Sequence, residues 1–218
     1  MSDDDREELE LPKLGPVGPS FVRSALIFYG VMGCAALIWR MAVPGQSIMY
    51  PSPEAASDAW GSFAALFAGG LAGLAAVIVS ELLTRSTKLG EALEDLLGES
   101  LAGLRTQDAI LLALASGLGE EMLFRGALQP SVGIVWASLI FGACHFMPRR
   151  ELALWSVYAV AMGFGFGILY EWTGNLIAPV VAHVVVNGIN LPRLARSHEE
   201  KSQVAETTDS ESTDDDSC

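Results

Sequence analysis

Six apolar segments alternate with short polar connections along the central part of the chain. A helix needs about 20 mostly apolar residues to cross the hydrocarbon core of a bilayer, and each segment approaches that length. The pattern therefore predicts an all-α protein, a polytopic transmembrane helical bundle of about six spans. The fourth segment is short, which fits a tilted or partly re-entrant helix. The segments cover roughly residues 22 to 43, 59 to 83, 109 to 129, 131 to 147, 152 to 171 and 174 to 191.

A different periodicity occupies the connection between the second and third segments. Six leucines recur there at helical spacing, opposite a row of acidic residues, which predicts an amphipathic helix at the membrane interface within residues 84–107. Because its polar face is acidic, we expect it to pack against the protein rather than bind anionic lipid. The leucines are Leu89, Leu93, Leu96, Leu97, Leu101 and Leu104, and the acids are Glu91, Glu94, Asp95 and Glu99.

Lysine and arginine are concentrated in alternate connections, and cytoplasmic flanks of membrane helices hold the excess of these residues. Six spans with both termini in the cytoplasm satisfy this rule, and we expect the protein in the cell membrane. Only Arg40 and Arg125 fall outside the pattern. The flanking residues are Arg6, Lys13, Arg23, Arg85, Lys88, Arg105, Arg149, Arg150, Arg193, Arg196 and Lys201.

Composition adds a domain division to this picture. The 218 residues are 51% hydrophobic and 18% charged, which is too apolar for an ordinary soluble domain. The net charge of −13 comes almost entirely from the two ends of the chain, so we expect disordered acidic tails at 1–20 and 192–218. Between them lie two N-terminal helices (21–83) and a four-helix core (108–191). The acidity argues against nucleic-acid binding.

Three charged residues interrupt the third apolar segment, where a charge near the bilayer centre costs about 2.5 to 3.5 kcal/mol. Glu121 and Arg125 are four residues apart, hence on one helix face, and can form an ion pair. Glu120 lies about 100° further round the helix and lacks that partner. An unpaired carboxylate in this position suits a group that accepts and returns protons.

Two of the three histidines also lie in apolar segments. Phe141 and His145 are one helical turn apart near the end of the fourth segment, and His183 and Asn187 have the same spacing in the sixth. We expect Phe141 to serve packing. His198 falls in the acidic tail and receives no role.

These residues support two kinds of hydrolytic chemistry. A carboxylate and an imidazole can activate water while a second imidazole and an amide stabilise an oxyanion. Alternatively, Glu120, His145 and His183 can bind zinc and leave one position open for water. The His-Glu-x-x-His motif of many zinc proteases is absent. The residues alone do not decide between the two.

The combination of Glu120-Glu121-x-x-x-Arg125, Phe141-x-x-x-His145 and His183-x-x-x-Asn187, each in its own apolar helix, resembles the CPBP family. This family includes CAAX-processing endopeptidases and bacteriocin-processing or self-immunity membrane proteins. The likeness covers roughly residues 105 to 191, including the segments 163–167 and 173–176.

The resemblance implies an intramembrane endopeptidase that acts on a membrane-associated protein or peptide, with its site open to the cytoplasm. Glu120 and His145 would activate water, and His183 with Asn187 would form the oxyanion site. Glu121 and Arg125 would support this geometry. No metal is favoured, and zinc is the alternative. The resemblance does not identify the substrate, nor whether it is prenylated.

Other readings explain fewer of these residues. A rhomboid-like serine protease using Ser116 and His183 would lack the glycine expected two residues before the serine, and would leave Glu120, His145 and Asn187 without a role. Cys144 as nucleophile is disfavoured because its neighbour His145 points about 100° away round the helix. A non-catalytic scaffold or transporter is the remaining alternative, although the two halves show no internal repeat of the kind transporters have.

Overall fold

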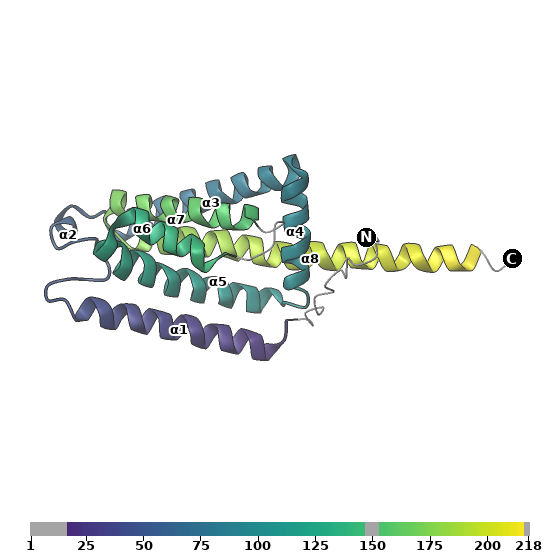
Figure 1. Ribbon diagram of the computed structural model, residues 1–218, viewed down its shortest axis with the longest axis horizontal. Coiled ribbons are helices and arrows are strands. Elements are labelled where there is room, and N and C mark those ends of the chain that lie inside the picture. Colours follow the sequence, from purple (N-terminus) through teal and green to yellow (C-terminus); the bar gives the residue numbers. More distant parts are fainter. Residues whose placement is uncertain (1–16, 147–152, 216–218) are drawn as a thin grey trace, which may run out of the picture.

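The computed structural model describes residues 17–146 and 153–215, and every regular element in these residues is a helix (Figure 1). The all-α prediction is thereby confirmed. Most of the predicted N-terminal tail, residues 1–16, lies outside the described residues, as do Arg149 and Arg150.

Five helical segments in the described residues are long and apolar enough to cross a membrane: Pro19–Met41, Ser62–Ser86, Thr106–Cys144, Leu154–Thr173 and Ile177–Val204. Their outward faces carry large apolar side chains such as Phe63, 87% exposed, and Ile38, 70% exposed. In water such a surface would be strongly unfavourable, whereas lipid is its natural surrounding. The molecule is an integral membrane protein with a polytopic helical bundle.

The third and fourth predicted spans form one helical run that reverses its direction. The run comprises α5 (Thr106–Glu121), a π-helical stretch η1 (Met122–Leu128) and α6 (Gln129–Cys144). Gly133 breaks it with φ 82° and ψ 163°, a backbone conformation that glycine adopts without steric cost. His145 consequently lies 3.8 Å from Glu120, whereas a straight helix would separate these residues by about 37 Å. The number of crossings, six, stays a prediction.

The remaining long helices are α1 (Pro19–Met41), α3 (Ser62–Ser86), α7 (Ala153–Thr173) and α8 (Ile177–Asp215). The beginning of α1 and the later part of α8 lie at one end of the bundle, and the connection containing α2 (Ala55–Asp58) lies at the other (Figure 1).

Helix α4 (Lys88–Ser100) lies across the end of the bundle where α1 begins (Figure 1). The Thr87 hydroxyl caps it by accepting a hydrogen bond from the backbone N–H of Gly90, at 2.9 Å. The helix falls within the segment whose leucine spacing predicts an amphipathic helix.

Helix α8 corrects one prediction. Disorder was expected from residue 192, but the helix continues to Asp215. Tertiary contacts explain the first part of this extension. Leu194 lies against Gly98 of α4, and the Ser197 hydroxyl donates to Glu94 of the same helix at 3.0 Å. Ala195 is buried in an apolar cluster that includes Val22 and Leu104. Charge density alone predicted a solvated coil, because the partners in α4 are about 100 residues away in the sequence.

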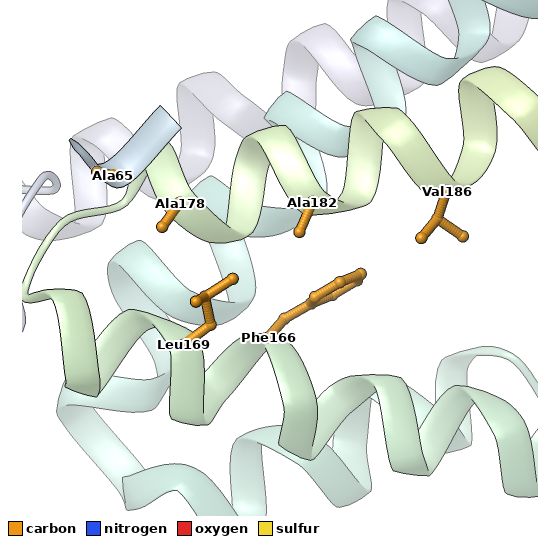
Figure 2. Packing of buried hydrophobic residues seen from close by; sticks show 6 residues of the cluster. All are labelled: Ala65, Phe166, Leu169, Ala178, Ala182 and Val186. Carbon is orange, nitrogen blue, oxygen red and sulfur yellow. The ribbon is translucent and has the colours of Figure 1, made fainter. Parts of the chain in front are cut away.

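Small residues allow the helices around α8 to approach closely. Phe166 and Leu169 of α7 point toward Ala178 and Ala182 of α8 (Figure 2), and Ala65 of α3 completes this core together with Val186. A Cβ atom added at Gly69 of α3 would lie 2.3 Å from the Ala178 carbonyl oxygen. This packing fixes α8, and with it His183 and Asn187, against the rest of the bundle.

Candidate active site

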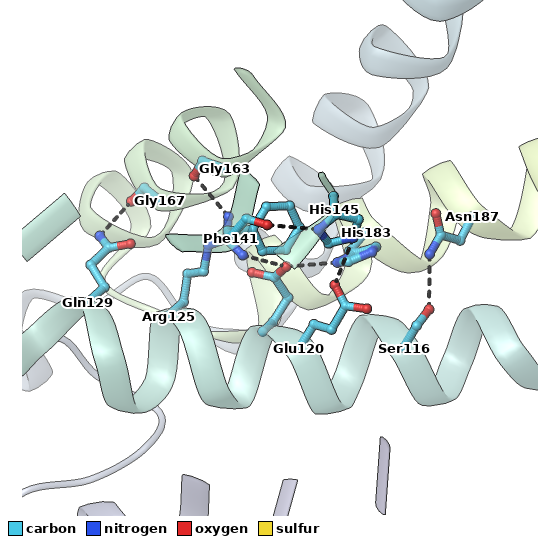
Figure 3. Close-up of polar contacts among 11 residues, drawn as sticks. Ser116, Glu120, Arg125, Gln129, Phe141, His145, Gly163, Gly167, His183 and Asn187 are labelled. Atoms are coloured by element: carbon cyan, nitrogen blue, oxygen red, sulfur yellow. Dashed lines mark hydrogen bonds and ion pairs between the residues drawn. The ribbon is translucent and has the colours of Figure 1, made fainter. Parts of the chain in front are cut away.

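The structure brings the predicted site residues of three helices together inside the bundle (Figure 3). Glu120 comes from α5, His145 directly follows α6, and His183 and Asn187 lie one turn apart on α8. The reversal at Gly133 is what returns His145 to the level of Glu120. Glu120 and His183 are buried, at 6% and 5% exposure.

Glu120 and His145 face each other across a short gap. The Glu120 Oε2 and His145 Nε2 atoms are 3.8 Å apart, and the carboxylate atom has no hydrogen-bond partner among the described residues. On its other side, His145 Nδ1 lies 2.8 Å from the Phe141 carbonyl oxygen. A carbonyl oxygen can only accept, so Nδ1 carries the hydrogen and Nε2 of the neutral ring presents its lone pair to Glu120. A gap of this width between two acceptors suits a bridging water that donates to both.

Glu121 connects two other members of the cluster. Its Oε1 atom accepts from Arg125 Nη1 at 3.0 Å and from His183 Nδ1 at 2.8 Å. The ion pair predicted from the spacing of Glu121 and Arg125 is thereby confirmed, and both side chains are fully buried. Arg125 also donates through Nη2 to the Gly163 carbonyl oxygen at 2.9 Å. The carboxylate thus orients the His183 ring, and Arg125 links it to α7.

Aromatic rings enclose these polar groups. The Arg125 guanidinium lies 4.5 Å from the centroid of the Phe141 ring, and Phe141 also contacts His145 at a centroid distance of 4.5 Å. Phe166 stacks on His183, with 5.1 Å between centroids and 24° between ring planes. Phe141 thus packs against Arg125 and His145, the role expected of it from the sequence. Phe166 was not singled out from the sequence, where it is one apolar residue among many.

Asn187 is hydrogen-bonded to Ser116, which the sequence suggested only as the nucleophile of a serine protease. Its Nδ2 atom donates to the Ser116 hydroxyl at 3.0 Å, and Ser116 Oγ lies 3.4 Å from the Ala113 carbonyl oxygen. Ser116 is therefore placed to orient the Asn187 amide. His183, the base that a serine protease would need, is engaged through Nδ1 with Glu121.

A second polar contact braces the same helices further along. Gln129 Nε2 donates to the Gly167 carbonyl oxygen at 3.1 Å and to Glu171 Oε1 at 3.0 Å. Together with the Arg125–Gly163 bond, it holds the π-helical stretch against α7 (Figure 3). π-Helical turns are frequent at functional sites. No sequence signal distinguished Gln129.

The site opens into a cavity of about 380 Å³, within the range usual for ligand sites. Apolar side chains from α1, α4, α7 and α8 form most of its wall, and the cavity extends toward the end of the bundle that α4 covers. The four residues predicted to be catalytic all line it: Glu120, His145, His183 and Asn187.

The zinc alternative requires Glu120, His145 and His183 to surround one metal ion. Among the described residues, no group of three His, Cys, Asp or Glu side chains is arranged to hold a metal ion. Glu120 and His145 approach each other, whereas His183 points its Nδ1 at Glu121. The zinc alternative stays a prediction, and the reaction proposed below uses no metal.

Comparison with known proteins confirms the resemblance seen in the motifs. Residues 102–189 match a family described as type II CAAX prenyl endopeptidase Rce1-like, consistent with a CPBP-type protease. The chain is also similar to the uncharacterized protein YpbD of Bacillus subtilis (strain 168), with 45% identity over 82 residues. That alignment covers 37% of this chain and 42% of YpbD, so the chain matches under half of that relative's length. No solved structure matches.

Proposed function

We propose that the protein is an intramembrane endopeptidase that hydrolyses peptide bonds of a membrane-associated protein or peptide. The observation that carries this proposal is the pair of acceptors, Glu120 Oε2 and His145 Nε2, facing each other at 3.8 Å beside a cavity. Such a pair is suited to bind and activate water. The match of residues 102–189 to a protease family supports the same reaction class.

In the proposed reaction, a water molecule donates one hydrogen bond to Glu120 and one to His145. As its oxygen attacks the scissile carbonyl carbon, a proton passes to this pair and is later delivered to the departing amine nitrogen. The C–N bond breaks, and the products are a carboxylate and an amine.

The oxyanion of the tetrahedral intermediate would lie against His183 and Asn187. Because Nδ1 of His183 donates to Glu121, Nε2 can donate to an oxyanion only when the ring is protonated on both nitrogens. A charged His183 and Arg125 would balance Glu120 and Glu121, which suits a buried site. Ser116 would hold the Asn187 amide in place.

The topology of this proposal follows the lysine and arginine pattern. Six crossings place both termini and α4 on the cytoplasmic side of the cell membrane, with the cavity open toward that side. A substrate already associated with the membrane would reach the site from the cytoplasmic leaflet.

Comparison of membrane proteomes tests the proposed activity and finds its substrate. Wild-type cells and a Glu120→Ala strain with equal protein levels would be compared for newly formed N- and C-termini. We expect at least one membrane protein to accumulate uncleaved in the variant strain. Indistinguishable sets of termini would contradict the protease and favour the non-catalytic scaffold or transporter.

Chelation tests the choice between the water-activating pair and zinc. We expect the purified protein to keep its activity after exhaustive chelation, with no zinc found by elemental analysis. Activity lost on chelation and restored by Zn²⁺ alone would establish the metal-dependent alternative.

A further inference from the structure

Tyr29 of α1 shares the cavity with the catalytic cluster, although it lies far outside the matched residues 102–189. Buried residues recur every three or four positions along α1 and form a stripe on one side of this helix. On this stripe, Tyr29 is a half-buried residue with a hydroxyl group. The stripe includes Val22, Gly33, Ala36 and Arg40.

The backbones of α1 and α5 approach each other at this point. A Cβ atom added at Gly119 would lie 2.7 Å from the Tyr29 carbonyl oxygen and 3.2 Å from its Cβ atom. Gly119 directly precedes Glu120 in the chain. Helix packing therefore holds Tyr29 against the residue next to Glu120, and the Tyr29 and Glu120 side chains line the same cavity.

We propose that Tyr29 is a positioning residue of the active site, whose hydroxyl donates a hydrogen bond to the Glu120 carboxylate. His145 Nε2 faces Oε2 of this carboxylate. A hydrogen bond from Tyr29 to the other oxygen would leave Oε2 directed at the attacking water. This inference rests on the proposed function for its catalytic meaning, whereas the contact itself does not depend on it.

The surroundings of Glu120 determine which experiment isolates this contact. The charged and titratable side chains around it come from five elements: Glu121 from α5, Arg125 from η1, His145 from the end of α6, His183 from α8 and Tyr29 from α1. Replacing tyrosine by phenylalanine removes one hydroxyl and leaves the other groups in place.

Infrared spectroscopy of the full-length protein in lipid vesicles tests the contact without a substrate. The carboxyl band that disappears in Glu120→Gln is assigned to Glu120, and its frequency is compared between wild type and Tyr29→Phe. We expect this band to move in Tyr29→Phe, because the loss of a hydrogen bond changes the stretching frequency of the carboxyl group. Tyr50→Phe, the same chemical change in the loop beyond α1, should leave the band where it is in the wild type.

Activity gives the second readout, with a quenched peptide that spans a cleavage site found in the proteome comparison. We expect Tyr29→Phe to lower kcat about tenfold, the effect of about 1.4 kcal/mol, with KM unchanged.

An unchanged Glu120 band in Tyr29→Phe overturns the inference, whatever the activity. Wild-type protein that cleaves nothing overturns the proposed function instead, and the infrared comparison still decides whether Tyr29 contacts Glu120.

Discussion

At the scale of single residues, the cluster combines contacts within one helix and contacts between distant helices. The Glu121–Arg125 pair could be predicted because its partners are four residues apart on one helix. The bonds from His183 to Glu121 and from Asn187 to Ser116 could not, since 62 and 71 residues separate the partners. Spacing rules describe one helix at a time, and they carry no information on which faces meet.

The buried ion pair gives a prediction about stability. Replacing Arg125 by methionine keeps the bulk of the side chain but leaves Glu121 buried without its cation, which should cost about 3 to 5 kcal/mol. Thermal unfolding in detergent micelles measures this loss. Arg105→Ala removes a solvent-exposed pair with Asp108 and should leave the melting temperature nearly unchanged. Equal melting temperatures for both variants would show that the buried pair contributes no stability.

Ser116 gives a second prediction at this scale. Ser116→Ala removes the acceptor that orients the Asn187 amide, so we expect kcat to fall by about tenfold, corresponding to one hydrogen bond of about 1 kcal/mol or slightly more. The fall should be far smaller than that caused by losing a serine nucleophile. Steady-state cleavage of the quenched peptide measures it, and complete inactivation of a folded variant would revive the serine-protease reading.

At the scale of helices, hydrophobic periodicity located the apolar segments but not their bends. The sequence divided the third and fourth spans near residue 130, where Pro130 follows Gln129, and the reversal occurs at Gly133. The π-helical stretch had no sequence signal. The extension of α8 was missed because it depends on α4, whose position across the bundle end is a tertiary feature.

Packing of α3 against α8 predicts that alanine substitutions at two neighbouring glycines change the stability of the protein in opposite directions. A Cβ atom at Gly69 would lie 2.3 Å from the Ala178 carbonyl oxygen, whereas one at Gly70 meets nothing within 4 Å. We expect Gly69→Ala to destabilise the protein by about 1 to 3 kcal/mol through overpacking. Gly70→Ala should stabilise it by up to about 1 kcal/mol through helix propensity. Unfolding of the two variants in the same detergent compares them, and equal shifts would contradict the close α3–α8 contact.

At the scale of the whole molecule, the sequence predicted an apolar helical bundle with a polar cluster inside, and the structure has both. The cavity reaches from this cluster toward the end of the bundle covered by α4. The sidedness of this arrangement is a prediction of the lysine and arginine pattern.

Cysteine labelling tests the sidedness. In a variant whose native cysteines Cys34, Cys144 and Cys218 are replaced, we expect Lys88→Cys at the start of α4 to react with an impermeant reagent only after the cells are opened. Glu54→Cys, beside α2 at the other end, should react in intact cells. The reverse pattern would place the cavity on the outer side.

The central claim is that Glu120 serves as the base that activates water for peptide-bond hydrolysis. The most direct measurement is the cleavage rate of purified Glu120→Ala protein in lipid vesicles, relative to wild type, with equal amounts of folded protein. We predict that Glu120→Ala forms no product above the uncatalysed background, and we expect the same of His145→Ala. Cleavage by Glu120→Ala at the wild-type rate would contradict it.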